Sequence, residues 1–165
     1  MHPAKIITAL FIFLCAVAST NARAQDNKAL LQMATCEESW LDFRQDPVKV
    51  QKYSGLFQAQ FREGGRDSSM VPIKPTQLLG LKISRVYPQS VGMGLGFSVI
   101  VDAGFDATKA GMEKQMGKSF EHCASEEGSK SCELSIADKK TVVLMEGARG
   151  KKPQTLLGCY YYYEK

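Results

Sequence analysis

The sequence predicts an α+β fold, in which N-terminal helices are followed by a mostly antiparallel β-sheet of about five strands with one inserted helix. Three observations support this prediction. Apolar residues recur at helical spacing over residues 27–62, and they alternate with a period of two in most segments after residue 76. A single helical segment interrupts this second region after Val101. Four cysteines follow the first 24 residues, so we expect disulfide bonds to stabilise the fold.

The first 24 residues have the features of a signal peptide. Lys5 supplies a positive charge, an apolar run covers residues 6–18, and Ala22-Arg23-Ala24 fits a small-x-small cleavage site. A membrane anchor is the alternative, but this apolar run is too short to span a bilayer comfortably. We expect residues 1–24 to be cleaved and residues 25–165 to form a single domain. The protein would then be periplasmic, with no membrane association after cleavage.

The charge of the mature chain argues against nucleic acid as a partner. Lys5 and Arg23 leave with the signal peptide, so 19 of the 21 Lys and Arg residues remain against 17 Asp and Glu residues, a net charge of +2. Positive and negative residues are interleaved along the chain. Because nucleic-acid binding usually needs a clustered basic surface, we expect no such partner.

Two helices are predicted at the start of the domain. Asp26 or Asn27 can cap a first helix that extends to about residue 43. Asp46 followed by Pro47 is typical of a helix start, and apolar spacing continues this second helix to about residue 62. Residues 63–75 are rich in turn formers and charge, which predicts a loop.

The segment Val91–Val101 is the most regular strand of the sheet. Its odd positions are all apolar, whereas its even positions begin Gly92, Gly94, Gly96, Ser98. One face should therefore cover a core, and the other face carries almost no side chains. Two explanations stay open: a helix packs closely against the glycines, or the glycines form a shallow floor for a partner. A strand over residues 76–87 is expected to pair with this one after a turn at Pro88-Gln89-Ser90.

The last third of the chain predicts one helix and several strands. Asp106 can cap a helix over residues 107–116, and Gly117 suits its C-terminal end. Strands are expected over residues 133–136 and 141–145, joined by a hairpin turn, and from residue 155 to the C-terminus.

The mature chain keeps an even number of cysteines, which suits an oxidising compartment. Four cysteines allow three pairings, of which we predict Cys123–Cys132 around a short turn and Cys36–Cys159 between the two ends of the domain. A zinc site is the alternative use of four cysteines, but no CxxC pair is present.

No motif for catalysis or cofactor binding is present. The glycines do not match a dinucleotide fingerprint, because the third comes one residue too early and apolar alternation continues through it. His122 is the only histidine of the mature chain, and it adjoins a cysteine expected in a disulfide. We expect no enzyme activity, no metal site and no cofactor. A hydrolase that uses paired carboxylates stays an alternative, because Asp and Glu are numerous.

The final strand places tyrosines on both of its faces. Gly158, Tyr160 and Tyr162 share one face, and an in-phase register would bring them beside the glycines of Val91–Val101. Tyrosine offers a large, rigid contact area with a polar tip, which interfaces favour. The alternative is that one face is core and the other lies under a helix. The predicted binding residues are Gly92, Gly94, Gly96, Tyr160 and Tyr162.

In its general composition the chain resembles the periplasmic immunity proteins and lysozyme inhibitors of Gram-negative bacteria. The likeness rests on the signal (Met1–Ala24) and on the segments Ser90–Val99 and Leu156–Lys165. It implies a protein partner, namely a bacterial effector toxin that attacks the cell wall, and a role in blocking it. The alternative function is a domain that binds a small molecule or a cell-wall fragment in the glycine-floored groove.

Overall fold

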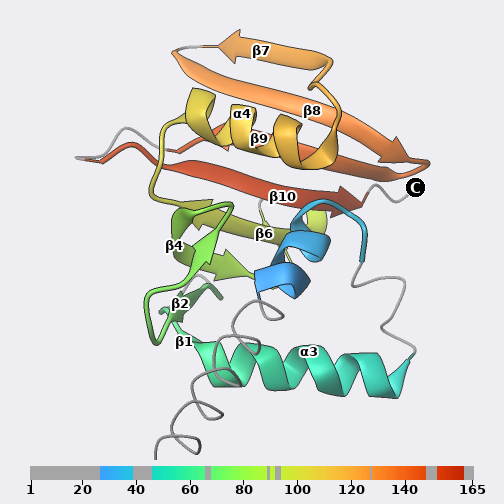
Figure 1. The fold of residues 1–165 in the computed structure, drawn as a ribbon, viewed down its shortest axis with the longest axis vertical. Coiled ribbons are helices and arrows are strands. Elements are labelled where there is room, and N and C mark those ends of the chain that lie inside the picture. The colour runs from blue at the N-terminus through green and yellow to red at the C-terminus, as the bar shows by residue number, and fades with distance from the viewer. Residues whose placement is uncertain are drawn as a thin grey trace, which may run out of the picture.

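The computed structural model describes residues 27–38, 46–65, 68–88, 90–91, 94–126, 128–147 and 152–161. The predicted signal peptide lies outside these residues. Within them the chain has an α+β fold with an antiparallel sheet, as predicted (Figure 1). The sheet is larger than expected, because the described residues form ten strands instead of about five.

The N-terminal region differs in part from the expected pair of helices. Residues 27–34 are helical, but residues 35–38 form a turn. The prediction is wrong there because Cys36 has a φ of 62°, a left-handed conformation that ends a right-handed helix. The expected remainder, residues 39–43, lies outside the described residues. The second predicted helix is present as α3 (Pro47–Gln60), and the Asp46 side chain caps it by accepting hydrogen bonds from the N–H groups of Val48 and Lys49.

Ten strands and one further helix complete the domain. The inserted helix is α4 (Phe105–Met116), which ends at Gly117 with a φ of 63°. The order of the main sheet is β1-β2-β4-β6-β10-β9-β8-β7, with β3 paired to β4 and β5 paired to β6. In chain order the strands are β1 (Phe61–Glu63), β2 (Met70–Pro72), β3 (Gln77–Leu78), β4 (Leu81–Tyr87), β5 (Ser90–Val91), β6 (Gly94–Val101), β7 (His122–Glu126), β8 (Ser129–Ala137), β9 (Lys140–Glu146) and β10 (Thr155–Tyr161).

The additional strands occupy segments that local patterns did not mark. The expected loop over residues 63–75 contains β2, which pairs with β1, and β7 pairs with β8 at the other end of the sheet. The central hairpin also turns later than expected. Val91 belongs to β5 and pairs with Gly94, and β4 and β5 both pair antiparallel with β6, so the turn predicted at Pro88-Gln89-Ser90 is wrong.

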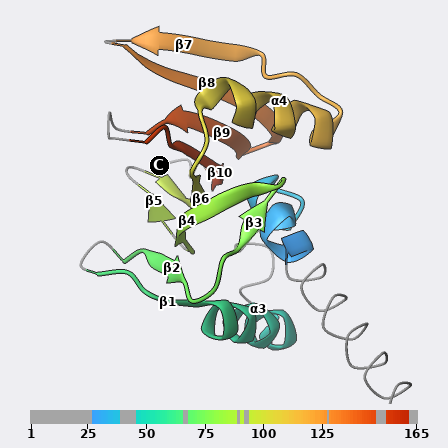
Figure 2. The same ribbon diagram turned by 60° about the vertical axis from the view of Figure 1, so that its left-hand side comes forward.

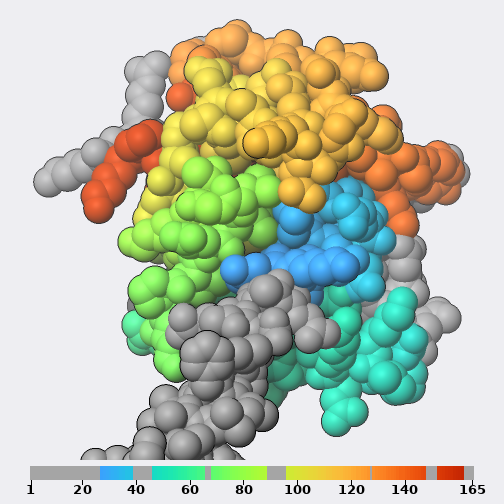
Figure 3. Space-filling view, viewed as in Figure 1, coloured from blue at the N-terminus to red at the C-terminus, as the bar shows by residue number. Residues whose placement is uncertain are grey.

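The core lies between one face of the sheet and the helices. The helix at residues 27–34 and α4 lie over the same face in both views (Figures 1 and 2). Figure 3 shows these segments packed side by side with the β2–β4 region. Phe97, Val99 and Val101 of β6 point into this core, and α3 reaches it through Phe57, whose ring lies 6.1 Å from that of Phe97. Completely buried core residues include Leu30, Met33, Phe97, Val99, Val101, Met112 and Leu144.

Both predicted disulfide bonds are confirmed. Cys36 is bonded to Cys159 with a Cα–Cα distance of 5.2 Å, and Cys123 to Cys132 with a Cα–Cα distance of 4.0 Å. This pairing rules out the use of these four cysteines as zinc ligands. Disulfides fit an oxidising compartment outside the cytosol. Among the described residues, no helix combines the length and the apolar character that crossing a bilayer requires.

Candidate protein-binding face

Gly96 and Tyr160, two of the predicted binding residues, lie on the sheet face that points away from the core. Residues directly opposite each other in an antiparallel pair share a face. Tyr160 of β10 is opposite Gly96 of β6, and Ser98 of β6 is flanked by Gly158 of β10 and Tyr87 of β4. Since Phe97, Val99 and Val101 point into the core, this second set points the other way.

Two of the five predicted residues, Gly92 and Tyr162, lie outside the described residues. Gly94 is the first residue of β6, where it pairs with Val91. The structure therefore brings together Gly96 and Tyr160 from segments that are far apart in the sequence.

The inserted helix does not explain the glycines of β6. The buried side chains of α4 are Phe105, Thr108 and Met112, and both Phe105 and Met112 belong to the core on the opposite face. The nearest neighbour of a side chain at Gly111 would be Leu79, at 3.7 Å, and not β6. The helix at residues 27–34 and α3 also bury their apolar side chains in that core, so none of the three described helices packs on the side of Gly96.

Gly96 and Gly158 are needed because β6 and β10 approach each other closely. Both glycines are buried. A Cβ atom at Gly96 would run into the carbonyl oxygen of Cys159, and one at Gly158 would lie 2.5 Å from the carbonyl oxygen of Phe97. Real Cβ atoms do not come this close to backbone atoms, so each site excludes any side chain. The glycines therefore serve the sheet itself, whatever they contribute to binding.

Several apolar side chains accompany Tyr160 on this face, and the sequence analysis missed them. The register places Leu156 opposite Ile100 and Met145, and Val143 opposite Gly158. Val143 is buried but is not part of the main core. Met145 is 44% exposed, one of the few large apolar residues so exposed in the described part of the chain. We call this surface the Tyr160 face; it consists of Tyr87, Ile100, Val143, Met145, Leu156 and Tyr160.

The Tyr160 face is unusual for an antiparallel sheet. Such sheets commonly carry polar side chains on the face that does not cover the core. Here Ile100, Leu156 and Tyr160 are half-buried. The sequence does contain a signal for this face. In β9 and β10 the residues that alternate with the core positions are also largely apolar.

A polar cluster holds the strands together at one end of the sheet. The side-chain amide of Gln154 donates to Asp102 Oδ1 at 2.9 Å and to Ser84 Oγ at 3.3 Å. Lys82 Nζ lies 3.4 Å from Asp102 Oδ2. The hydrogen bond from Gln154, assisted by Lys82 and Ser84, holds the pKa of Asp102 below its usual value of 3.8 despite partial burial.

This cluster predicts a loss of stability in acid. The folded-state pKa of Asp102 lies below its unfolded value, so the stability that this carboxylate contributes is complete above about pH 5 and is lost as pH falls through the folded pKa. Urea unfolding between pH 6 and pH 2 measures it. The decrease should be smaller in Asp102→Asn, which cannot titrate. Equal decreases in both proteins would contradict the prediction.

Two clefts lie beside α3, away from the Tyr160 face. One, of about 390 Å³, is lined by Asn27, Ala59, Gln60, Ile73, Lys74, Pro75, Thr76 and Gln77. The other, of about 470 Å³, is lined by Lys28, Ala29, Gln32, Lys52, Tyr53, Gly55, Leu56 and Ala59.

His, Cys, Asp and Glu residues do not gather into a metal-binding group of three or more in the described part of the chain.

No protein-family model matches the chain, and no curated protein or solved structure matches it either.

Proposed function

We propose that this chain is an exported protein-binding protein, which acts in the periplasm as an immunity protein or inhibitor of an antibacterial effector that attacks the cell wall. The observation that carries the proposal is the Tyr160 face. It combines aromatic and aliphatic side chains on a sheet surface that the helices of the described residues leave uncovered. Apolar patches of this kind mark sites of interaction.

The form of this face favours a protein over a small molecule. Small ligands usually need a concave pocket that buries most of their surface. The two clefts described above lie elsewhere, whereas Tyr160, Leu156 and Met145 come from neighbouring positions of one sheet. Tyrosine and methionine are enriched at protein interfaces. Two disulfides hold the sheet in place, so binding should cost little conformational entropy of the backbone.

The proposed action is binding without catalysis. His122 lies exposed on an edge strand, opposite Glu133 of β8, and its neighbour Cys123 is oxidised. Neither an activated nucleophile nor an acid–base pair is formed there. A blocking role needs only a surface that covers the active site of the effector.

A direct experiment tests this function. The purified mature protein is mixed with purified effector enzymes that cleave the glycan strands or the peptide crosslinks of the cell wall, and hydrolysis is followed. We expect stoichiometric inhibition of one such enzyme. Cells that export the chain should survive periplasmic expression of the same enzyme, and cells that retain it in the cytosol should not. Absence of both inhibition and protection across these enzyme classes would contradict the proposal.

Met145→Asp is the substitution that probes the Tyr160 face. It places a charge on the Tyr160 face, directly opposite Leu156, and we expect affinity for the inhibited enzyme to fall at least thirtyfold, as for the loss of an interface hot spot of about 2 kcal/mol. The melting temperature should change little, because Met145 is 44% exposed. Val48→Asp is the matched control: Val48 is 76% exposed on α3 and should not affect binding. Equal losses in both variants would contradict binding at this face.

A second candidate function has one observation in its favour. The cleft of about 390 Å³ is lined mainly by amide, hydroxyl and ammonium groups, and it has the size of a small-ligand site. Such groups suit a cell-wall fragment. Titration with soluble cell-wall fragments, monitored by calorimetry, separates this function from the first: binding should be lost in Gln60→Ala and unchanged in Met145→Asp.

A further inference from the structure

Strand β7 leaves one edge of the sheet unpaired. It is the last strand in the sheet order, and within the described residues its only strand partner is β8. All five of its residues are exposed. Figure 1 shows β7 at the top of the domain, away from the helices at residues 27–34 and from α3. A strand in this position can pair with a strand of another molecule.

The register shows which backbone groups of β7 point outward. In antiparallel sheets, pairs that exchange no hydrogen bonds have Cα atoms about 4.5 Å apart, and hydrogen-bonded pairs about 5.5 Å apart. Cys123 and Cys132 are 4.0 Å apart, so they belong to the first kind. Lys130 lies opposite Ser125, and its backbone N–H points away from β7 and donates to the Glu146 carboxylate at 3.1 Å. The pair of Ser125 and Lys130 therefore also exchanges no hydrogen bonds. The backbone N–H and C=O groups of Cys123 and Ser125 therefore face outward.

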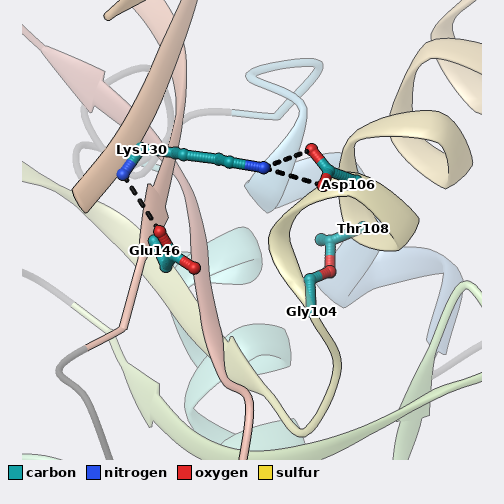
Figure 4. A network of polar contacts seen from close by, with 5 residues as sticks. All are labelled: Gly104, Asp106, Thr108, Lys130 and Glu146. Carbon is teal, nitrogen blue, oxygen red and sulfur yellow. Dashed lines mark hydrogen bonds and ion pairs between the residues drawn. The ribbon is translucent and has the colours of Figure 1, made fainter. Parts of the chain in front are cut away.

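The edge is held in place before any partner arrives. Lys130 Nζ contacts both carboxylate oxygens of Asp106 at 2.8 and 3.1 Å, which joins the β7–β8 hairpin to the first turn of α4 (Figure 4). The Thr108 hydroxyl donates to the carbonyl oxygen of Gly104 at 3.0 Å in the same turn. The Cys123–Cys132 disulfide ties β7 to β8. Pairing would thus require little ordering of the chain.

We propose that β7 pairs antiparallel with β7 of a second copy of this chain, with Ala124 of both copies at the centre. In this register Cys123 of each copy lies opposite Ser125 of the other, and each of these pairs exchanges two backbone hydrogen bonds. His122 of each copy lies opposite Glu126 of the other, so an imidazole meets a carboxylate twice.

Other registers use the edge less well. Centring the pair on Cys123 places His122 opposite Ala124, and centring it on Ser125 places Glu126 opposite Ala124. Both shifts lose the His122–Glu126 contact and leave one outward-facing residue without a partner inside the strand. The self-complementary sequence of β7 therefore favours a second copy over the strand of another protein.

The dimer would present two Tyr160 faces together. Opposite residues of an antiparallel pair share a face, so both copies would direct Tyr160 to the same side of one continuous sheet. The inference does not depend on the proposed function, because it uses none of the residues of the Tyr160 face.

Sedimentation velocity of the disulfide-intact protein over a wide concentration range tests the dimer. We expect a concentration-dependent monomer–dimer equilibrium in the unmodified protein. Ser125→Pro removes an outward-facing N–H and no β7–β8 hydrogen bond, so it should be monomeric with an unchanged circular dichroism spectrum. Ser125→Ala retains the N–H and should dimerise like the unmodified protein.

Charge substitutions test the register without altering the backbone. Glu126→Lys places a lysine opposite His122 of the second copy, and dimer affinity should fall roughly tenfold through the two affected pairs. His122→Lys retains the attraction to Glu126 and should dimerise at least as well as the unmodified protein. A protein that stays monomeric at every concentration, or a dimer that neither Ser125→Pro nor Glu126→Lys weakens, would overturn the proposal.

Discussion

Removal of the Cys36–Cys159 disulfide by the double substitution Cys36→Ala/Cys159→Ala is expected to lower the free energy of unfolding by about 4–5 kcal/mol in the chain-entropy account. The bond joins residues 123 positions apart, so it restricts most of the unfolded chain. Both cysteines are also buried, Cys159 completely, beside the core positions of the sheet. A loss of this size is a large part of the stability of an ordinary domain.

The second disulfide provides the control. Cys123 and Cys132 are only 9 positions apart, so the same account predicts a loss of about 2–3 kcal/mol for Cys123→Ala/Cys132→Ala. Urea unfolding of the three proteins, monitored by tryptophan fluorescence and circular dichroism, measures both effects. The expected order would be refuted by a larger loss from the short loop than from the long one.

The second large effect is expected from Gly96→Ala, which should destabilise the domain by about 3 kcal/mol, the upper part of the usual cost of overpacking. The added methyl group would run into the carbonyl oxygen of Cys159 on the neighbouring strand. This neighbour is backbone, so it cannot move aside like the end of a flexible side chain. The strands β6 and β10 would have to separate at the centre of the sheet.

Gly55→Ala is the matched control for Gly96→Ala. Gly55 lies inside α3, and a Cβ atom there would have no neighbour within 4 Å. Alanine has a higher helix propensity than glycine, so the free energy of unfolding of this variant should rise by about 0.5–1 kcal/mol. Thermal and urea unfolding measure both changes. If Gly96→Ala were fully stable but lost binding of the inhibited enzyme, the glycine would belong to the binding surface and not to the packing of the sheet.

Local chemistry determined part of the fold and of the candidate site. Asp46 and Pro47 begin α3 through a cap and a fixed φ, both of which act within one turn of helix. The alternating residues of β6 separate a core face from a glycine face because the side chains of any strand alternate. The disulfide pairing could also be predicted, because a short hairpin and the two ends of a domain are natural places for such bonds.

Only the tertiary structure decided the additional strands and the composition of the Tyr160 face. Strands β1, β2 and β7 are short or polar, and they form because neighbouring strands supply hydrogen-bond partners, which no local pattern records. The pairing of Gly96 with Tyr160 depends on the register between strands that are about sixty residues apart, and a shift of one residue would place Tyr160 in the core. Met145 and Leu156 join the same face through that register. Their partners lie on other strands, so the sequence around each could not reveal the face they form.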